Sequence, residues 1–293
     1  MNIRDLKYLL AVAEHKSFIK AAQSCCVSQP TLSMQIKKLE QSLGVAIFER
    51  NNKRVLITAL GEQIIASAQQ ALQHVRHIEV LAKNAQNPYA GDLKLGAFPT
   101  LAPYILPKIV SPIKHQLKDL RLILIEEKTN TLIEQLKAGQ LDVALLAGPI
   151  NEPQLNCDYL FDDLFKLAVS PQHSLAQKTE IHASDLIGQP LLLLDEGHCL
   201  REQALQFCQI SGAKELHNVR ATSLETLRQM VRAETGITFM PEMAISPDDQ
   251  RIKYIRFCKP EPKRSVYLVW RKTNPRLELM AVLKEIILNT QIK

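Results

Sequence analysis

The chain has 293 residues, enough for one small and one medium domain, and its composition is that of an ordinary globular protein. No stretch approaches the ~18 apolar residues of a membrane span, and residues 1–10 lack a signal-peptide core. These features predict a cytoplasmic protein with no membrane partner, whose six cysteines are free thiols. The net charge of +6 is concentrated in residues 1–60, where nine Lys and Arg face four Asp and Glu, which favours a polyanionic partner for this part.

Residues 1–58 contain three short helical patterns and a hairpin pattern. Apolar spacing predicts helices at 3–15, 18–24 and 29–43, with Ser17 and Ser28 as N-caps of the second and third. Strand-like segments at 46–49 and 55–58 enclose a basic tip. The second and third helices form a helix-turn-helix, because the third shows amides and hydroxyls near its start and lysines further along.

Short polar side chains can read base edges, while cations hold phosphates. The candidate DNA-contacting residues are Ser28, Gln29, Pro30, Thr31, Ser33, Gln35, Lys37, Arg50, Lys53 and Arg54. Three other residues of this region are interpreted as structural. Cys25 and Cys26 are expected as buried or half-buried thiols, and Met34 as a packing residue.

The pattern of residues 59–90 predicts a long helix with Thr58 as its N-cap. Its apolar residues recur at spacings of four and three, which is typical of a two-stranded coiled coil. They are Ile64, Ala68, Ala71, Val75, Ile78 and Ala82. We therefore expect this linker helix to dimerise; the alternative is a helix packed on its own domain. Residues 87–91 end it and mark the boundary to a second domain.

Residues 91–293 alternate between strand-like and helix-like runs, which indicates parallel sheets with helices on both faces. The last strand and helix return to the first set. This predicts two subdomains, 91–162 with 267–293 and 163–266, joined by crossovers near residues 162 and 266. Thr100 and Thr129 follow predicted strands, where α/β folds bind ligands, although each is also a plausible helix N-cap.

The segment from residue 195 to 208 holds the most reactive candidate. Cys199 is predicted in the first turn of a helix, between His198 and Arg201, where the helix dipole and cations lower a thiol pKa. Cys208 lies about 13 Å further along such a helix, whereas a disulfide needs Cα atoms within roughly 7 Å. The two can pair only if the helix unwinds. Alternatively they are unrelated cysteines; a zinc site with His217 lacks the usual close ligand pairs.

Several motifs of the first sixty residues carry a family resemblance. They are Ser17-Phe18, Ala21-Ala22, Val27-Ser28-Gln29-Pro30-Thr31-Leu32-Ser33, Leu43-Gly44-Val45 and Phe48-Glu49-Arg50. They resemble the DNA-binding domain of LysR-type transcriptional regulators. The resemblance implies a mixed α/β protein with a winged helix-turn-helix, a dimerisation helix and a periplasmic-binding-protein-like effector domain of two subdomains.

Motifs of the second domain narrow the resemblance to the peroxide-sensing members of that family. They are Leu193-Leu194-Asp195-Glu196-Gly197-His198-Cys199-Leu200-Arg201, Phe207-Cys208, Arg220-Ala221-Thr222-Ser223-Leu224 and Lys259-Pro260-Glu261-Pro262. The sequence departs from the pattern at Asn218, where those relatives carry histidine; His217 stands one place earlier.

This resemblance implies that hydrogen peroxide oxidises Cys199 and that Cys208 closes a reversible disulfide. Thr100, Thr129, His198 and Arg201 would form the peroxide pocket. The implied partners are double-stranded DNA, RNA polymerase, a glutaredoxin- or thioredoxin-type reductant, and further copies of the chain in a homodimer or homotetramer. No cofactor, metal or enzymatic turnover is expected. The alternatives are a LysR-type regulator controlled by a small ligand and a thiol peroxidase.

Overall fold

The computed structural model describes residues 1–50, 55–84, 87–195, 200–205, 214–215, 221–246 and 249–291. The chain divides into two compact units, Met1–Ala82 and Lys83–Lys293. No helix of the described residues is long and apolar enough to cross a lipid bilayer.

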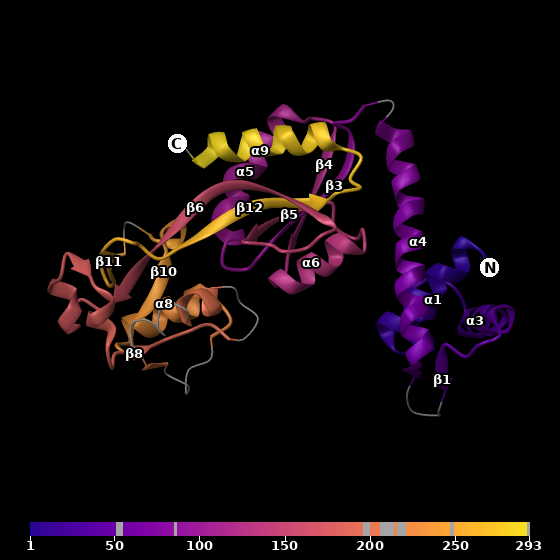
Figure 1. The fold of residues 1–293 in the computed structure, drawn as a ribbon, viewed down its shortest axis with the longest axis horizontal. Coiled ribbons are helices and arrows are strands. Elements are labelled where there is room, and N and C mark those ends of the chain that lie inside the picture. The colour runs from indigo at the N-terminus through magenta and orange to yellow at the C-terminus, as the bar shows by residue number, and fades with distance from the viewer. Residues whose placement is uncertain are drawn as a thin grey trace. The chain divides into compact units, whose positions relative to one another are not determined.

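The first unit contains three short helices, a two-stranded hairpin and a long helix (Figure 1). These are α1 (Ile3–His15), α2 (Phe18–Ser24), α3 (Gln29–Leu43), β1 (Phe48–Arg50), β2 (Val55–Ile57) and α4 (Ala59–Asn84). The predicted bounds of α1, α2 and α3 are confirmed, because local signals define them. Ser17 and Ser28 cap α2 and α3 through the backbone N–H groups of Lys20 and Thr31, and Gly44 ends α3 at a φ of 72°.

The second unit is built on one eight-stranded sheet of order β4-β3-β5-β12-β6-β11-β7, with β10 also paired to β6. Its strands are β3 (Gly91–Ala97), β4 (Leu120–Glu126), β5 (Val143–Ala147), β6 (Leu155–Val169), β7 (Glu180–Ile181), β10 (Thr238–Pro241), β11 (Lys253–Phe257) and β12 (Lys263–Arg271). A separate two-stranded sheet pairs β8 (Pro190–Leu191) with β9 (Lys214–Glu215).

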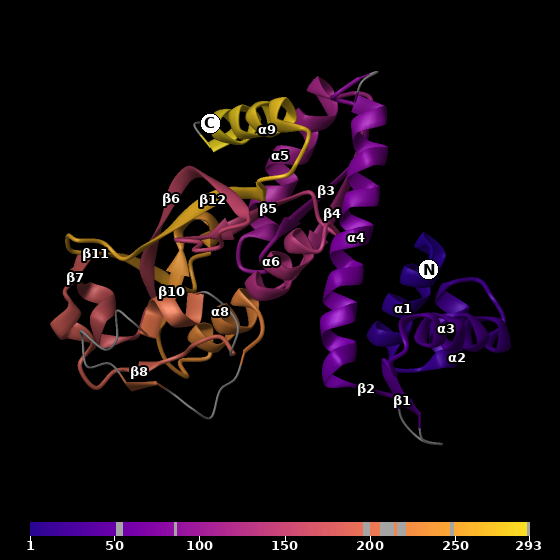
Figure 2. The same ribbon diagram turned by 45° about the vertical axis from the view of Figure 1, so that its right-hand side comes forward.

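The helices of this unit are α5 (Ala102–Gln116), α6 (Thr129–Lys137), α8 (Leu224–Arg232) and α9 (Leu277–Gln291), with short 3₁₀ turns at Ser174–Gln177, Ala183–Leu186 and Glu242–Ala244. Strands β3, β4 and β5 are parallel to one another. The connection through α5 leads from β3 to the edge strand β4, and the one through α6 leads back past β3 to β5. Right-handed crossovers in opposite directions place α5 and α6 on opposite faces of the sheet (Figures 1 and 2).

The expectation of parallel sheets is confirmed for these three strands and for the pairs β7–β11 and β8–β9, but it is wrong for the strands that pair with β6 and β12. Strand β12 is antiparallel to both β5 and β6, and β10 and β11 are antiparallel to β6. The reason is that β6 and β12 are long return strands. β6 pairs with β12 from Leu155 to Leu164 and then with β10 and β11 from Phe165 onward.

Two apolar cores lie on either side of the point where β6 changes its strand partners. We call them the first lobe, around β3, β4, β5, α5, α6 and α9, and the second lobe, around β10, β11, α8 and the carboxyl-terminal end of β6. The only tryptophan of the chain, Trp270, is buried in the core of the first lobe. β6 and β12 are the strands that connect the two lobes (Figure 2).

Candidate functional sites

The polar face of α3 is the candidate nucleic-acid interface. The apolar stripe of Leu32, Ile36 and Leu39 is buried in the core of the first unit. Gln29, Pro30, Thr31 and Lys37 are exposed, and Ser33 and Gln35 are half-buried. Ser28 is exposed too, but its hydroxyl already accepts from the Thr31 N–H at 3.3 Å and lies 2.7 Å from the Thr31 hydroxyl.

The hairpin beside α3 has a basic end. Arg50 is the last residue of β1 and its backbone pairs with Val55. Lys53 and Arg54 lie outside the described residues, so their place relative to α3 stays a prediction.

Two interpretations made for this unit are wrong. Met34 is 52% exposed and does not pack in the core, because it lies on the side of α3 opposite the buried stripe. Cys26 is exposed and not buried, since the chain turns there with a φ of 55°, while Cys25 is half-buried as expected.

Glu40 is a residue to which the sequence assigned no role, although Leu39-Glu40 is part of the motifs that resemble the LysR family. Its Oε1 accepts hydrogen bonds from the backbone N–H groups of Ile47 (2.9 Å) and Phe48 (3.0 Å). This carboxylate therefore fixes the first strand of the hairpin to α3. The sequence offers only a weak signal for it, an acidic residue in the second half of an otherwise neutral or basic helix.

Helix α4 shows features of both interpretations of the linker, packing on its own domain and an apolar surface available for dimerisation. Its first half packs on the helix-turn-helix through Ile64, Ile65 and Leu72, with Ala68 buried. Its second half exposes Ile78 and Leu81. The apolar face is thus used internally near residue 68 and is open to a second chain further along.

Thr100 and Thr129 follow neighbouring parallel strands, since Ala97 of β3 is paired with Glu126 of β4. Neither is a helix N-cap: Leu101 precedes α5, Lys128 precedes α6, and neither helix has a side-chain cap. The alternative interpretation of the two threonines as simple caps is therefore wrong. The Thr129 Oγ1 is buried and has no hydrogen-bond partner among the described residues. A buried, unpaired hydroxyl calls for a specific explanation.

Thr100 is held by a buried cation. Its hydroxyl accepts from Arg264 Nη1 at 2.8 Å, and its carbonyl accepts from Nη2 at 3.1 Å. Arg264 also donates from Nε (3.0 Å) and Nη2 (2.7 Å) to one carboxylate oxygen of Asp163. The guanidinium carbon lies 5.1 Å from the centre of the Phe98 ring, and the Met243 N–H donates to the other oxygen of Asp163 at 3.1 Å.

This network lies where β6 passes from one lobe to the other. Arg264 and Asp163 are cross-strand partners of β12 and β6, and they are only 1% and 3% exposed. Sequence reasoning missed both. The available signal was an arginine at the first inward position of β12, in the alternation Arg264, Val266, Leu268, where a charge must find a partner.

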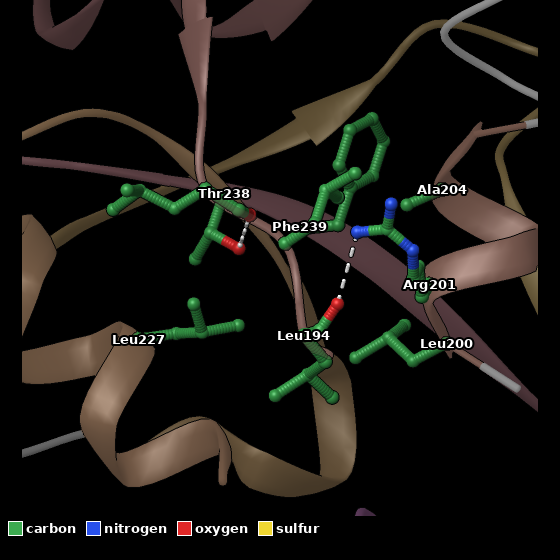
Figure 3. A pocket seen from close by; sticks show the side chains of 9 residues that line it. Leu194, Leu200, Arg201, Ala204, Leu227, Thr238 and Phe239 are labelled. Atoms are coloured by element: carbon green, nitrogen blue, oxygen red, sulfur yellow. Dashed lines mark hydrogen bonds between the residues drawn. The ribbon is translucent and has the colours of Figure 1, made fainter. Parts of the chain in front are cut away.

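Arg201 is described on a helical segment, residues 200–205, whose Leu200 and Ala204 are buried as predicted. Its Nη1 donates to the carbonyl of Leu194 at 3.1 Å (Figure 3). Arg201 also lines a shallow crevice in the second lobe, together with Leu227 and Phe239, that is too narrow to admit a water molecule. His198, Cys199 and Cys208 lie outside the described residues, so their roles remain predictions.

Cys157 and Cys258 have environments that favour the protonated thiol. Burial raises the pKa of Cys157, with a further contribution from Asp158. The pKa of Cys258 is raised by burial and by its hydrogen bond to Glu180, whose Oε2 lies 3.4 Å from Sγ. Both cysteines are half-buried free thiols. The described residues contain no group of three His, Cys, Asp or Glu arranged to hold a metal ion.

A two-helix DNA-binding motif, a long linker helix and a two-lobed α/β domain together define a bacterial regulator architecture. Residues 3–62 match the bacterial regulatory helix-turn-helix protein model of the lysR family, and residues 86–291 match the LysR substrate binding domain. The chain belongs to the LysR family of bacterial regulatory proteins, as its motifs predicted.

Within that family the chain is similar to OxyR proteins. It is 46% identical to a hydrogen peroxide-inducible genes activator of Haemophilus influenzae over 94% of this chain and 92% of the relative. A full-length OxyR variant of Pseudomonas aeruginosa has a TM-score of 0.79 and 35% identity, over 98% of this chain and 94% of the other. A peroxide-bound cysteine mutant of Corynebacterium glutamicum OxyR has a TM-score of 0.66 and 31% identity, over 99% and 94%.

Proposed function

We propose that the protein is a DNA-binding transcriptional activator that senses hydrogen peroxide through a reversible disulfide between Cys199 and Cys208. The similarity to peroxide-inducible activators along nearly the whole chain supports this assignment. The position of Thr100 and Thr129 after neighbouring strands, where neither caps a helix, also supports it. The unpaired, buried hydroxyl of Thr129 is the structural observation that carries the proposal.

The proposed ligand chemistry follows from these hydroxyls. Hydrogen peroxide has two O–H donors and four lone pairs, so it can donate to the Thr129 oxygen and accept from a threonine proton. Arg264 occupies one lone pair of the Thr100 hydroxyl, which leaves the Thr100 proton free to donate to a peroxide oxygen. Thr100 lies in the turn between β3 and α5 and Thr129 is the first residue of α6, so elements that pack on the sheet position both hydroxyls before a ligand binds.

The proposed chemistry proceeds in two balanced steps. The thiolate of Cys199 attacks one peroxide oxygen, the O–O bond breaks, and the products are a sulfenic acid and hydroxide, which takes up a proton to become water. The thiolate of Cys208 then attacks the sulfenic sulfur, forms the S–S bond and releases a second hydroxide. His198 and Arg201 would stabilise the thiolate and the departing hydroxide.

Closing this bond requires that the helix between the two cysteines unwinds, because their separation along a helix exceeds the reach of a disulfide. The backbone change is the proposed signal to the DNA-binding unit. A thiol reductant of the glutaredoxin or thioredoxin type reverses it. The exposed apolar residues Ile78 and Leu81 support a homodimer through α4, and we propose that the assembly, up to a tetramer, acts on RNA polymerase in the cytoplasm.

Peptide mass spectrometry of the peroxide-treated full-length protein tests the redox step. We expect a Cys199–Cys208 disulfide while the other four thiols stay free. Cys199→Ser abolishes the peroxide-induced change in the DNA footprint, and the matched variant Cys258→Ser keeps it. An unchanged peroxide response in Cys199→Ser would overturn the proposal.

The threonine pocket has its own test. Thr129→Val removes the hydroxyl at constant size, and it should slow disulfide formation roughly tenfold, the effect of losing one hydrogen bond of about 1.4 kcal/mol in the transition state. Because this hydroxyl has no hydrogen-bond partner among the described residues, the free energy of unfolding should not fall. Thr290→Val is the matched control, since the Thr290 hydroxyl bonds only to the Ile286 carbonyl within α9. Equal rates in all three proteins would refute the role of Thr129.

A further inference from the structure

Met34 occupies a position on α3 that core packing does not explain. One residue turns an α-helix by about 100°, so Met34 lies roughly 160° around the helix from both Leu32 and Ile36. Those two side chains are fully buried, while Met34 is exposed. The apolar side chain is therefore at the centre of the face that α3 turns away from its own core.

Polar and basic residues surround Met34 on this face. Its neighbours three and four positions away are Pro30, Thr31, Lys37 and Lys38, and all four are exposed. Single exposed apolar residues are ordinary on protein surfaces. Here, however, the residue stands in the middle of the helix that a LysR-type helix-turn-helix presents to the major groove, with cations on one side that can fix its register against phosphates.

Only one kind of base edge in the major groove offers an apolar contact to the Met34 side chain. Every base edge in the major groove offers hydrogen-bond donors or acceptors, but thymine alone among the four standard bases adds a methyl group. A thioether makes only weak hydrogen bonds, whereas its long, unbranched and polarisable chain adapts to an apolar surface. We propose that Met34 is a specificity-determining residue that recognises a thymine of the operator by packing against its C5 methyl group.

This inference rests on the proposed DNA-binding function, and it assigns one base preference to one side chain. Uracil differs from thymine only by lacking that methyl group, so a thymine-to-uracil replacement removes the contact without changing any hydrogen bond. The operator is first obtained by selecting duplexes from a random pool with the full-length protein. Each thymine of the selected site is then replaced by uracil, one position at a time in both half-sites.

We expect one thymine per half-site at which the wild-type protein binds uracil-containing DNA about fourfold more weakly, the factor expected for burial of one methyl group. Met34→Ala should bind the thymine operator more weakly by a similar factor and should no longer distinguish thymine from uracil there. The variant keeps its fold, because Met34 is exposed and alanine favours a helix. Met34→Leu, which keeps an apolar side chain, should retain most of the discrimination.

Lys37→Ala is the matched control on the same face. Loss of a phosphate contact weakens binding to thymine and uracil operators equally and lowers the salt dependence of the affinity. If Met34→Ala discriminates thymine from uracil as well as the wild type does, the inference is wrong while sequence-specific DNA binding stands. If selection with the wild-type protein yields no specific duplex, the DNA-binding proposal and this inference both fail.

Discussion

The buried pair of Arg264 and Asp163 offers a quantitative test of how the two lobes are joined. Arg264→Met leaves the Asp163 carboxylate with one remaining donor, the Met243 N–H, in a site that is 3% exposed. Asp163→Leu leaves the guanidinium with only the oxygens of Thr100 and the Phe98 ring. Removing one partner of a buried ion pair costs about 3–5 kcal/mol, because the other charge stays buried without compensation.

The double variant Arg264→Met/Asp163→Leu should behave differently from the sum of the two. It buries no charge, and replacing a buried ion pair by apolar side chains of similar volume is often neutral or stabilising. We therefore expect it to be more stable than either single variant by at least ~2 kcal/mol. For a unit of this size, each single change lowers Tm by roughly 6–20 °C, at ~2–4 °C per kcal/mol.

Urea unfolding of the full-length protein at pH 7, followed by tryptophan fluorescence, measures these effects. Trp270 is the only tryptophan and lies in the core of the first lobe, so the signal reports on the second unit alone. If the double variant is as unstable as the sum of the two single variants, the pair makes no coupled contribution. The explanation of the lobe junction by charge compensation would then be wrong.

Three further changes test other parts of the second unit. Glu180→Gln removes a carboxylate that raises the pKa of Cys258, so alkylation of this thiol at pH 8 should become faster, and an unchanged rate would contradict the assignment. Gly236→Ala places a methyl group 2.6 Å from a backbone carbonyl oxygen, and we expect ~1–3 kcal/mol of lost stability in urea unfolding. Arg276→Gln removes charged hydrogen bonds to three backbone carbonyls of residues 88–92, so limited proteolysis of this segment should be at least ~10-fold faster. Equal cleavage rates in the variant and the wild type would show that these hydrogen bonds do not hold the segment in place.

The sequence predicted well the elements that local signals define. The bounds of α1, α2 and α3 are confirmed because serine or asparagine caps and regular apolar spacing define them within a few residues. Strand β6 runs from Leu155 to Val169, but its first half has no pattern that would predict a strand. Asp158 and Asp162 lie at partly exposed positions there, so this half lacks the apolar run that marks a buried strand.

The lobe junction could not be predicted because its partners are far apart in the sequence. Arg264 and Asp163 are separated by 101 positions, and Arg264 and Thr100 by 164. No local pattern records such a pair; only the pairing of β6 with β12 brings the charges together. The prediction for Met34 is wrong for the opposite reason. The helical angle already places this residue away from the buried stripe, so its apolar side chain alone does not indicate packing.

The network around Arg264 makes the orientation of Thr100 in the proposed peroxide pocket depend on residues of the second lobe. The Thr100 side chain belongs to the first lobe, yet the cation that orients it is paired with Asp163, whose other oxygen is bound by the backbone of Met243 next to β10. Thr100 is therefore oriented only while β6, β12 and the 3₁₀ turn at Glu242–Ala244 keep their mutual arrangement. In the proposed function, peroxide accepts a hydrogen bond from the Thr100 hydroxyl, so it would bind this arrangement more tightly than one in which the hydroxyl is turned away. Under that proposal, occupancy of the pocket and the geometry of the lobe junction are linked, and each stabilises the other.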